Sequence, residues 1–299
     1  MTSIINTLIP VLLLIPLGYF LKRLGLFKKE DTGLLTKLII NLLLPAVIFH
    51  AFLQLELKKE LWLLPLSGLI IIFLLFLISL VIGKILKWDK KLAAAFSIIF
   101  ASMEGGLIGY PLFLILFKEE GLAAIALWDI ANTLVVFTFL YFWAGKYGKE
   151  SGNLKASVKK MITCPIPLAM ILGIILNALN FSSLFIENFI AYLGNATPAI
   201  IMLTLGIALE PTFKAMKLPI ITILLKTIIG LALAILIINL FNFTGLWRLV
   251  TLVAATLPAP AVIYIFAAKQ KLNPDFVANY LSLALPIGVI IASLILTFA

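Results

Sequence analysis

The chain has 299 residues, of which 63% are hydrophobic and 12% charged, and its formal net charge at pH 7 is +10. One soluble core cannot bury so much apolar surface, which excludes a soluble globular domain. The 23 lysines and arginines fall in short gaps between apolar runs and form no basic stripe that a nucleic-acid backbone could follow. The single cysteine, Cys164, excludes an internal disulfide and a cysteine-based metal cluster. Composition therefore predicts a polytopic membrane protein without a nucleic-acid partner.

The apolar runs predict ten membrane-crossing helices, because about 20 apolar residues span the hydrocarbon core of a bilayer. In chain order we expect them at residues 4–22, 34–53, 62–86, 91–117, 121–143, 162–180, 189–210, 219–240, 248–268 and 276–298. The first run is expected to stay in the protein, since no positive charge precedes it and Lys22 and Arg23 follow it. The longest polar connection, residues 145–160, is too short for a soluble domain.

Basic residues are distributed unequally between the two predicted sides. With an external N-terminus, 18 lysines and arginines face the cytoplasm and 4 face outside, namely Lys58, Lys59, Lys118 and Arg248. The positive-inside rule therefore predicts a plasma-membrane protein with both termini outside.

Three pairs of motifs recur in the same order about 150 residues apart, which predicts an internal repeat. The pairs are Pro10 and Gly18 with Pro165 and Gly173, Pro45-Ala46 with Pro198-Ala199, and Tyr110-Pro111 with Ala259-Pro260. We expect two five-helix repeats, residues 1–150 and 151–299. Because five is an odd number of crossings, the second repeat is inverted relative to the first, as in many secondary transporters.

The fourth and ninth expected helices contain residues that interrupt helices. Residues 100–113 hold Gly105, Gly106, Gly109 and Pro111, and the ninth helix holds Pro258 and Pro260 on either side of Ala259. Proline removes a backbone donor and glycine tolerates unwound geometry. Non-helical backbone at membrane depth must be buried in protein or line a wet cavity. We expect a break here that marks a cavity or a tight helix crossing; simple kinks in packed helices are the alternative.

Four segments carry a resemblance to the auxin efflux carrier family, which includes plant PIN-type carriers and bacterial malate and malonate permeases. They are "EGGLIGYPL" at 104–112, "LPAPAVIYIFAAKQKLNPD" at 257–275, "NLLLPAVIF" at 41–49 and "ATPAIIMLTLGIAL" at 196–209. The resemblance implies a ten-helix inverted-repeat fold akin to bile-acid/sodium symporters, with a scaffold part and a transport part. It also implies that helices four and nine cross at the substrate site and that the cargo is a small organic anion.

The expected substrate site follows from these motifs and from the polar residues near them. Its members are Asn41, Pro45, Glu104, Gly105, Gly106, Gly109, Tyr110, Pro111, Asp129, Asn132, Pro258, Ala259, Pro260 and Tyr264. The family pattern has asparagine where this chain has Glu104, and often another where it has Val262. An ionised Glu104 would repel an anion, so an anionic substrate needs Glu104 to be protonated or its charge offset.

Glu104 is predicted to lie near mid-membrane, where carboxylates serve as proton carriers or ion ligands. Asp129 and Asn132 are three residues apart and share a helix face, which either lines the cavity or forms an interhelical hydrogen-bond pair. At an offset of 150 residues their counterparts are Asn279 and Ser282. We expect Glu104 and Asp129 to bind the coupling ion.

Four polar residues have two readings each. Lys226 is expected to extend to the cytoplasmic interface, the alternative being an ion pair with Glu104 or Asp129. His50 is expected at the outer interface rather than in a proton relay. Tyr110 and Tyr264 supply hydroxyls to a substrate or pack as aromatic side chains.

The residues favour a secondary transporter over other functions. The sequence has no filter-like repeat of the kind that a channel needs and no nucleophile with a base near it in sequence, as an enzyme would need. It also has no phosphate-binding loop for ATP hydrolysis. We predict alternating access around helices four and nine without another cofactor, driven by a gradient of H⁺ or Na⁺ or by the gradient of the substrate itself. The expected partners are the bilayer, a small organic anion and, as an option, a second copy in a homodimer. The alternative is a sodium/proton antiporter that uses Glu104 and Asp129.

Overall fold

The computed structural model describes residues 6, 9–28, 30–56, 58–148, 163–209 and 216–298, and every regular element within them is a helix. The first half contains α2 (Leu14–Arg23), α3 (Asp31–Leu38), η1 (Ile39–Leu43), α4 (Leu44–Leu53), η2 (Lys59–Trp62), α5 (Leu63–Ile85), α6 (Lys90–Phe100), η3 (Gly105–Gly109), α7 (Tyr110–Val135), η4 (Val136–Leu140) and α8 (Tyr141–Tyr147). The second contains α10 (Pro165–Ala178), α11 (Leu184–Ala208), α12 (Lys217–Phe241), α13 (Gly245–Thr256), α14 (Val262–Gln270) and α15 (Pro274–Phe298).

Six helical stretches of the described chain are long and apolar enough to cross a membrane by length and composition. They are Asp31–Leu53, Lys59–Ile85, Lys90–Tyr147, Leu184–Ala208, Lys217–Phe241 and Pro274–Phe298, and two shorter apolar helices are Pro165–Ala178 and Gly245–Thr256. The longest stretch contains two of the ten expected crossings. Its backbone departs from helical geometry at Lys118, with φ 54° and ψ −144°, between the expected fourth and fifth helices. The connection expected at 145–160 and the repeat boundary at 150 lie largely outside the described residues.

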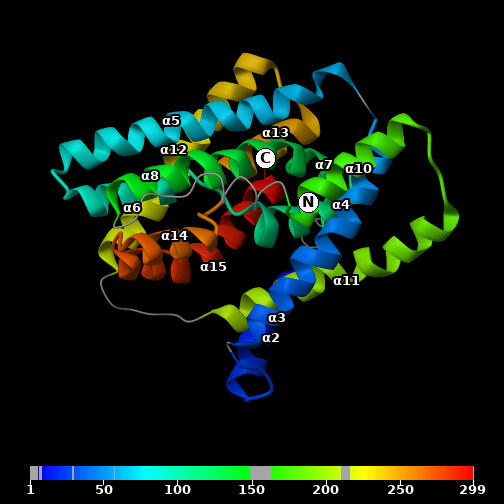
Figure 1. The fold of residues 1–299 in the computed structure, drawn as a ribbon, viewed down its shortest axis with the longest axis horizontal. Coiled ribbons are helices and arrows are strands. Elements are labelled where there is room, and N and C mark those ends of the chain that lie inside the picture. Colours follow the sequence, from blue (N-terminus) through cyan, green and yellow to red (C-terminus); the bar gives the residue numbers. More distant parts are fainter. Residues whose placement is uncertain are drawn as a thin grey trace.

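The helices form two groups, which lie on opposite sides in Figure 1. The first group consists of α2, α3, η1, α4, α10 and α11, in which α2 packs on α11 and α10 packs on α4. Glycines permit both contacts: a Cβ at Gly18 would collide with the carbonyl oxygen of Leu203, and one at Gly173 would lie 2.6 Å from the carbonyl oxygen of Phe49. The backbones of these helices therefore approach closely.

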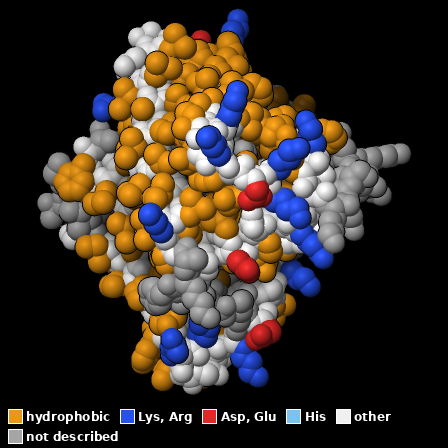
Figure 2. All heavy atoms as spheres, turned by 90° about the vertical axis from the view of Figure 1, so that its left-hand side faces the viewer, with side chains coloured by type: hydrophobic (Ala, Val, Ile, Leu, Met, Phe, Trp, Pro, Cys, Tyr) orange, Lys and Arg blue, Asp and Glu red, His pale blue; other side chains and the backbone are white. Residues whose placement is uncertain are grey.

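The second group consists of the remaining helices, with α5 packed on α6 and α7 and α12 packed on α13 and α15. Helix α6 begins at an N-cap, because the carboxylate of Asp89 accepts hydrogen bonds from the backbone N–H groups of Lys91 and Leu92. The outer surface of this group is apolar, with Phe73 of α5 50% exposed and Leu236 of α12 56% exposed. Figure 2 shows hydrophobic side chains over much of one face of the molecule, with lysine and arginine side chains scattered among them and several grouped toward its right-hand side. Such a surface is suited to contact with lipid.

Two interruptions lie inside the second group. The first break, residues 101–104, follows α6, and the second break, residues 257–261, follows α13. The first break lies inside the expected segment 100–113 but before its glycines and proline: Gly105, Gly106 and Gly109 belong to the π-helix η3, and Pro111 lies in the first turn of α7. Helix η3 runs directly into α7, so Pro111, which has no backbone N–H to donate, lies inside one continuous helical segment just after a π-helical turn. The second break contains Pro258, Ala259 and Pro260, as predicted.

Candidate functional site

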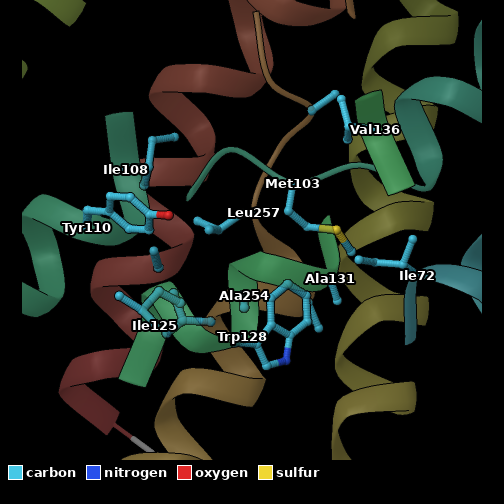
Figure 3. Packing of buried hydrophobic residues seen from close by; sticks show 14 of the residues in the cluster. Ile72, Met103, Ile108, Tyr110, Ile125, Trp128, Ala131, Val136, Ala254 and Leu257 are labelled. Carbon is cyan, nitrogen blue, oxygen red and sulfur yellow. The ribbon is translucent and has the colours of Figure 1, made fainter. Parts of the chain in front are cut away.

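The two breaks are hydrogen-bonded to each other. The backbone N–H of Glu104 donates to the carbonyl oxygen of Pro258 over 2.7 Å. Met103 and Leu257 belong to the same buried cluster, together with Tyr110 and Trp128 (Figure 3). A helix end frees backbone groups that need partners, and each break supplies one to the other. The breaks therefore form one structural unit, which we call the crossing, residues 101–104 with 257–261.

Asn132 of α7 supplies partners for the first break. Its side-chain oxygen accepts a hydrogen bond from the N–H of Met103 over 2.9 Å, and its side-chain nitrogen donates to the carbonyl oxygen of Met103 over 2.7 Å. Asn132 and Met103 are both buried. The same nitrogen of Asn132 also lies 2.7 Å from Asp129 Oδ1, to which it donates. The face that Asp129 and Asn132 share thus binds backbone and side chain within the protein.

Tyr280 of α15 plays the corresponding part at the second break. Its hydroxyl oxygen accepts a hydrogen bond from the N–H of Ala259 over 3.3 Å, and the side chain is 1% exposed. Tyr280 was not among the residues predicted from the sequence, whereas its neighbours Asn279 and Ser282 were. The hydroxyl of Ser282 donates to the carbonyl oxygen of Asn279 in the same helix. A tyrosine in the helix that follows a break is the signal that was available, because a buried tyrosine hydroxyl usually has a partner.

The carboxylate of Glu104 lies at the N-terminal ends of two helical segments. Its Oε1 accepts a hydrogen bond from the N–H of Leu107 in η3 over 3.0 Å, and its Oε2 accepts one from the N–H of Ala261 over 3.3 Å. Ala261 is the N-cap residue of α14. Free N–H groups and the helix dipole make such ends favourable for an anion. Glu104 is 7% exposed and so places a built-in carboxylate in an anion-binding position.

Asp129 is the second buried acid of the site. Its Oδ2 accepts a hydrogen bond from the hydroxyl of Tyr110 over 2.8 Å. Gly105 presses against this carboxyl group: a Cβ added there would lie 2.7 Å from Asp129 Cγ. Within the described residues, neither Asp129 nor Glu104 forms an ion pair with a lysine or arginine. In space, the backbone of Gly105 therefore lies between the two acids of the site, Glu104 and Asp129.

Lys226 of α12 lies where the sequence analysis did not expect it. The prediction that its ammonium extends to the cytoplasmic interface is wrong, because the residue is 1% exposed. Its Nζ donates to the carbonyl oxygen of Ile99 over 3.0 Å and to that of Ser102. The alternative pairing with Glu104 or Asp129 does not occur either. The last carbonyls of α6 lack helical partners, and the ammonium satisfies that of Ile99 together with that of Ser102 in the first break.

The other expected site residues lie in different surroundings. Asn41 is exposed in η1, where its side chain donates to the carbonyl oxygen of Lys37 over 2.8 Å. Pro45 is half-buried in the first turn of α4, and Tyr264 of α14 is 43% exposed. Among the described residues, the side chains of Asn41 and Tyr264 form no hydrogen bond with the crossing, although the backbone N–H of Tyr264 donates to the carbonyl oxygen of Ala261 over 3.1 Å. His50 of α4 is half-buried, and its Nε2 lies 3.0 Å from Gln54 Nε2.

Two cavities lie where the two helix groups meet. An apolar cavity of ≈220 Å³ between α4, α7 and α10 has Ile48, Tyr110 and Ile166 in its wall. A second cavity, ≈340 Å³, lies between α4, α7 and α11, with Val11 also in its wall, and includes His50 and Glu119, whose Nδ1 and Oε1 atoms are 3.7 Å apart. The first cavity is therefore lined by Tyr110, the residue whose hydroxyl donates a hydrogen bond to Asp129.

A larger recess of ≈900 Å³ lies beside these cavities, and Lys118 and Glu119 line it as they line the 340 Å³ cavity. It includes Glu56 and Lys58, whose Oε2 and Nζ atoms are 2.9 Å apart. The hydrogen bond to Glu56 raises the pKa of the exposed Lys58 ammonium. This charged recess is on the side that the positive-inside rule assigns to the exterior.

Comparison with known proteins gives three matches. The family model described as "Membrane transport protein" matches residues 3–299. An uncharacterized transporter of Methanocaldococcus jannaschii is 30% identical over an alignment of length 299 that covers 95% of this chain and 95% of that protein. An uncharacterized transporter of Methanothermobacter thermautotrophicus is 27% identical over 278 residues, which cover 92% of this chain and 91% of its own.

Proposed function

Because this chain belongs to the membrane transport protein family, which is the auxin efflux carrier family that its motifs predicted, we propose that it is a secondary transporter of a small organic anion of the carboxylate type. The observation that carries the proposal is the position of Glu104. Two backbone N–H groups at helix N-termini, those of Leu107 and Ala261, converge on one carboxylate. The same donors suit the carboxylate of a solute. A transporter of this kind needs no catalytic residue, and we propose none.

We propose that the chain forms two inverted repeats of five helices, residues 1–150 and 151–299. Reciprocal packing supports this arrangement: Gly18 of α2 meets Leu203 of α11, and 155 residues later Gly173 of α10 meets Phe49 of α4. In each contact the first helix of one half packs on the second helix of the other. Helices α6 and α13 also begin 155 residues apart and end 156 residues apart. From the distribution of basic residues we also propose that both termini lie on the outer side of the plasma membrane.

The coupling step that we propose is competition between Glu104 and the solute. When Glu104 takes up a proton, its neutral carboxyl group becomes a weaker acceptor for the N–H groups of Leu107 and Ala261, which are then free to bind another acceptor. A solute carboxylate then accepts these hydrogen bonds, and one negative charge replaces another at the helix ends. On release, the proton leaves and the Glu104 carboxylate returns. One proton accompanies each carboxylate charge, so the loaded site has the same charge as the empty one.

Movement of one helix group against the other would expose the site to each side in turn. The cavities of ≈220 and ≈340 Å³ support this step, because both lie between the groups. The close glycine contacts hold α2 on α11 and α10 on α4 within the first group. We therefore assign the first group as the scaffold and the second group, which carries the crossing, as the moving part. Such division is common among transporters with inverted repeats.

A sodium/proton antiporter is the second candidate. Two buried acids, Glu104 and Asp129, lie on either side of Gly105 without a described basic partner. Acids so placed can exchange a proton for a cation. This alternative requires the carboxylates themselves to bind the cation, whereas the main proposal requires Glu104 to leave the helix ends.

Thermal unfolding of the purified protein with small carboxylates, amines or sodium, at two pH values, distinguishes the two functions. For an anion carrier, we expect a carboxylate to stabilise the wild type only at the lower pH and Glu104→Gln at both. A cation antiporter gives the opposite pattern, because sodium stabilises the wild type at the higher pH and loses its effect in Glu104→Gln. Uptake of the stabilising solute into proteoliposomes under a pH gradient then tests transport directly.

A further inference from the structure

The C-terminal end of α6 is a cation-binding position inside the protein. A helix leaves its last carbonyl groups without intrahelical partners, and the helix dipole makes that end negative. In α6 this end is fully buried, because Ile99 and Ser102 are both 0% exposed. Broken helices in secondary transporters use such carbonyl oxygens to coordinate a coupling sodium ion.

Lys226 places its ammonium at this position. It donates hydrogen bonds to the carbonyl oxygens of Ile99 and Ser102, which come from the last turn of α6 and from the first break. An ammonium group is a compact point charge with three donors. No carboxylate of the described residues lies within ion-pair distance of it. The positive charge of Lys226 is therefore balanced by backbone carbonyls, which are also the ligands of a free cation.

Two further oxygen atoms border the same place. A small cavity of ≈10 Å³ is lined by Lys226, Thr256, Pro258 and Tyr280. The hydroxyl of Thr256 donates to the carbonyl oxygen of Val253 over 2.8 Å, which leaves its oxygen lone pairs for another partner. The hydroxyl of Tyr280 holds the second break. Removing the lysine side chain would join its volume to a cavity that already has oxygen atoms in its wall.

We propose that the Lys226 ammonium stands in for a coupling cation at the crossing, and that without it this position binds sodium. The wild type then carries its cation covalently and needs no sodium to hold α6 against the second break. One consequence of this inference rests on the proposed function: if the ammonium fills the cation site, the proton at Glu104 is the coupling ion. The cation site itself stands on the contacts of Lys226.

The test compares thermal unfolding in sodium chloride and in N-methyl-D-glucamine chloride at equal ionic strength. Lys226→Ala opens the site, Lys226→Met removes the charge while filling the space, and Lys84→Ala removes an exposed lysine at the end of α5 as a control. We expect the wild type and Lys84→Ala to unfold at the same temperature in both salts. Lys226→Ala should unfold at a lower temperature without sodium and regain stability as sodium is added, reaching a plateau. Lys226→Met should be less stable in both salts.

Equal unfolding temperatures of Lys226→Ala in the two salts would overturn the proposal, as would a sodium-specific rise in the wild type. Should Lys226→Ala not fold, Lys226→Ser replaces it, because a serine hydroxyl adds one oxygen ligand. Failure of both variants to fold even in sodium contradicts the proposal too, since sodium should replace the ammonium. These readouts need no transport. A protein that carries no carboxylate would therefore refute the proposed function without affecting the sodium result.

Discussion

The carboxylate of Glu104 accepts a hydrogen bond from the N–H of Ala261, 157 residues further along the chain. Together with the bond from Leu107, this contact makes Glu104 a substitute for a bound anion at two helix N-termini. The finding joins the two halves of the chain at one side chain. It also reconciles an acidic residue with a proposed anionic solute, since both use the same donors at different times.

The first prediction concerns the pH dependence of solute binding. In the wild type we expect affinity for a carboxylate to fall as pH rises, by about tenfold per pH unit where binding requires one proton. The reason is that the ionised Glu104 returns to the N–H groups of Leu107 and Ala261. Glu104→Gln is neutral at every pH and should bind the carboxylate without this dependence. Titration of the purified protein with the solute at several pH values measures both affinities.

Glu30→Gln is the control for this comparison, because Glu30 is an exposed carboxylate at the start of α3. It should keep the pH dependence of the wild type. If Glu104→Gln keeps the same dependence as well, Glu104 is not the group that takes up the proton.

The second prediction uses two neighbouring glycines. A Cβ at Gly105 would lie 2.7 Å from Asp129 Cγ, whereas the nearest atom to a Cβ at Gly106 is Glu104 Oε1 at 3.5 Å. Gly105→Ala should therefore displace the Asp129 carboxyl group and destabilise the protein by about 1–3 kcal/mol, the usual effect of overpacking. Gly106→Ala should unfold close to the wild-type temperature. Thermal unfolding followed by tryptophan fluorescence compares them, and equal losses in the two variants would contradict the close contact.

The third prediction concerns the two asparagines of the expected site. Asn132→Ala leaves the buried N–H and C=O groups of Met103 without their side-chain partner, which should destabilise the protein by about 1–3 kcal/mol. Asn41→Ala removes only an exposed bond to Lys37 within its own segment. That change should stay within about 0.5 kcal/mol, as is usual for surface positions. A loss for Asn41→Ala equal to that for Asn132→Ala would show that Asn41 has partners at the crossing.

The sequence predicted the helical class, the family and the segments that contain the two breaks, because composition and the proline and glycine pattern act locally. It did not predict where the first break lies. Glycine and proline show where a helix tolerates an interruption, but Glu104 ends up non-helical because its N–H binds the carbonyl of Pro258. Partners so distant in sequence leave no local signal.

Lys226 shows a different limit of sequence reasoning. Counting residues from the start of a helix gives a side chain's depth, but it does not give the face on which that side chain lies. At the same depth, a lysine that faces lipid extends to the interface, whereas Lys226 faces the end of α6. Tyr280 was missed for a related reason: its place in the helix after a break was a signal, but the sequence does not give the face of α15 on which its hydroxyl lies.

The last prediction tests whether the two helix groups move. His50 of α4 belongs to the first group and Glu119 of α7 to the second, and their Nδ1 and Oε1 atoms are 3.7 Å apart. With His50→Cys and Glu119→Cys in a Cys164→Ser background, a short bifunctional thiol reagent can bridge the groups. If transport requires the second group to move against the first, the bridge should abolish uptake into proteoliposomes. Solute binding from the side of the membrane on which His50 and Glu119 lie should persist. A cleavable reagent should restore uptake after reduction. Each single-cysteine variant treated in the same way should keep its activity. Uptake that continues through the bridged protein would show that transport does not require movement between these two helices.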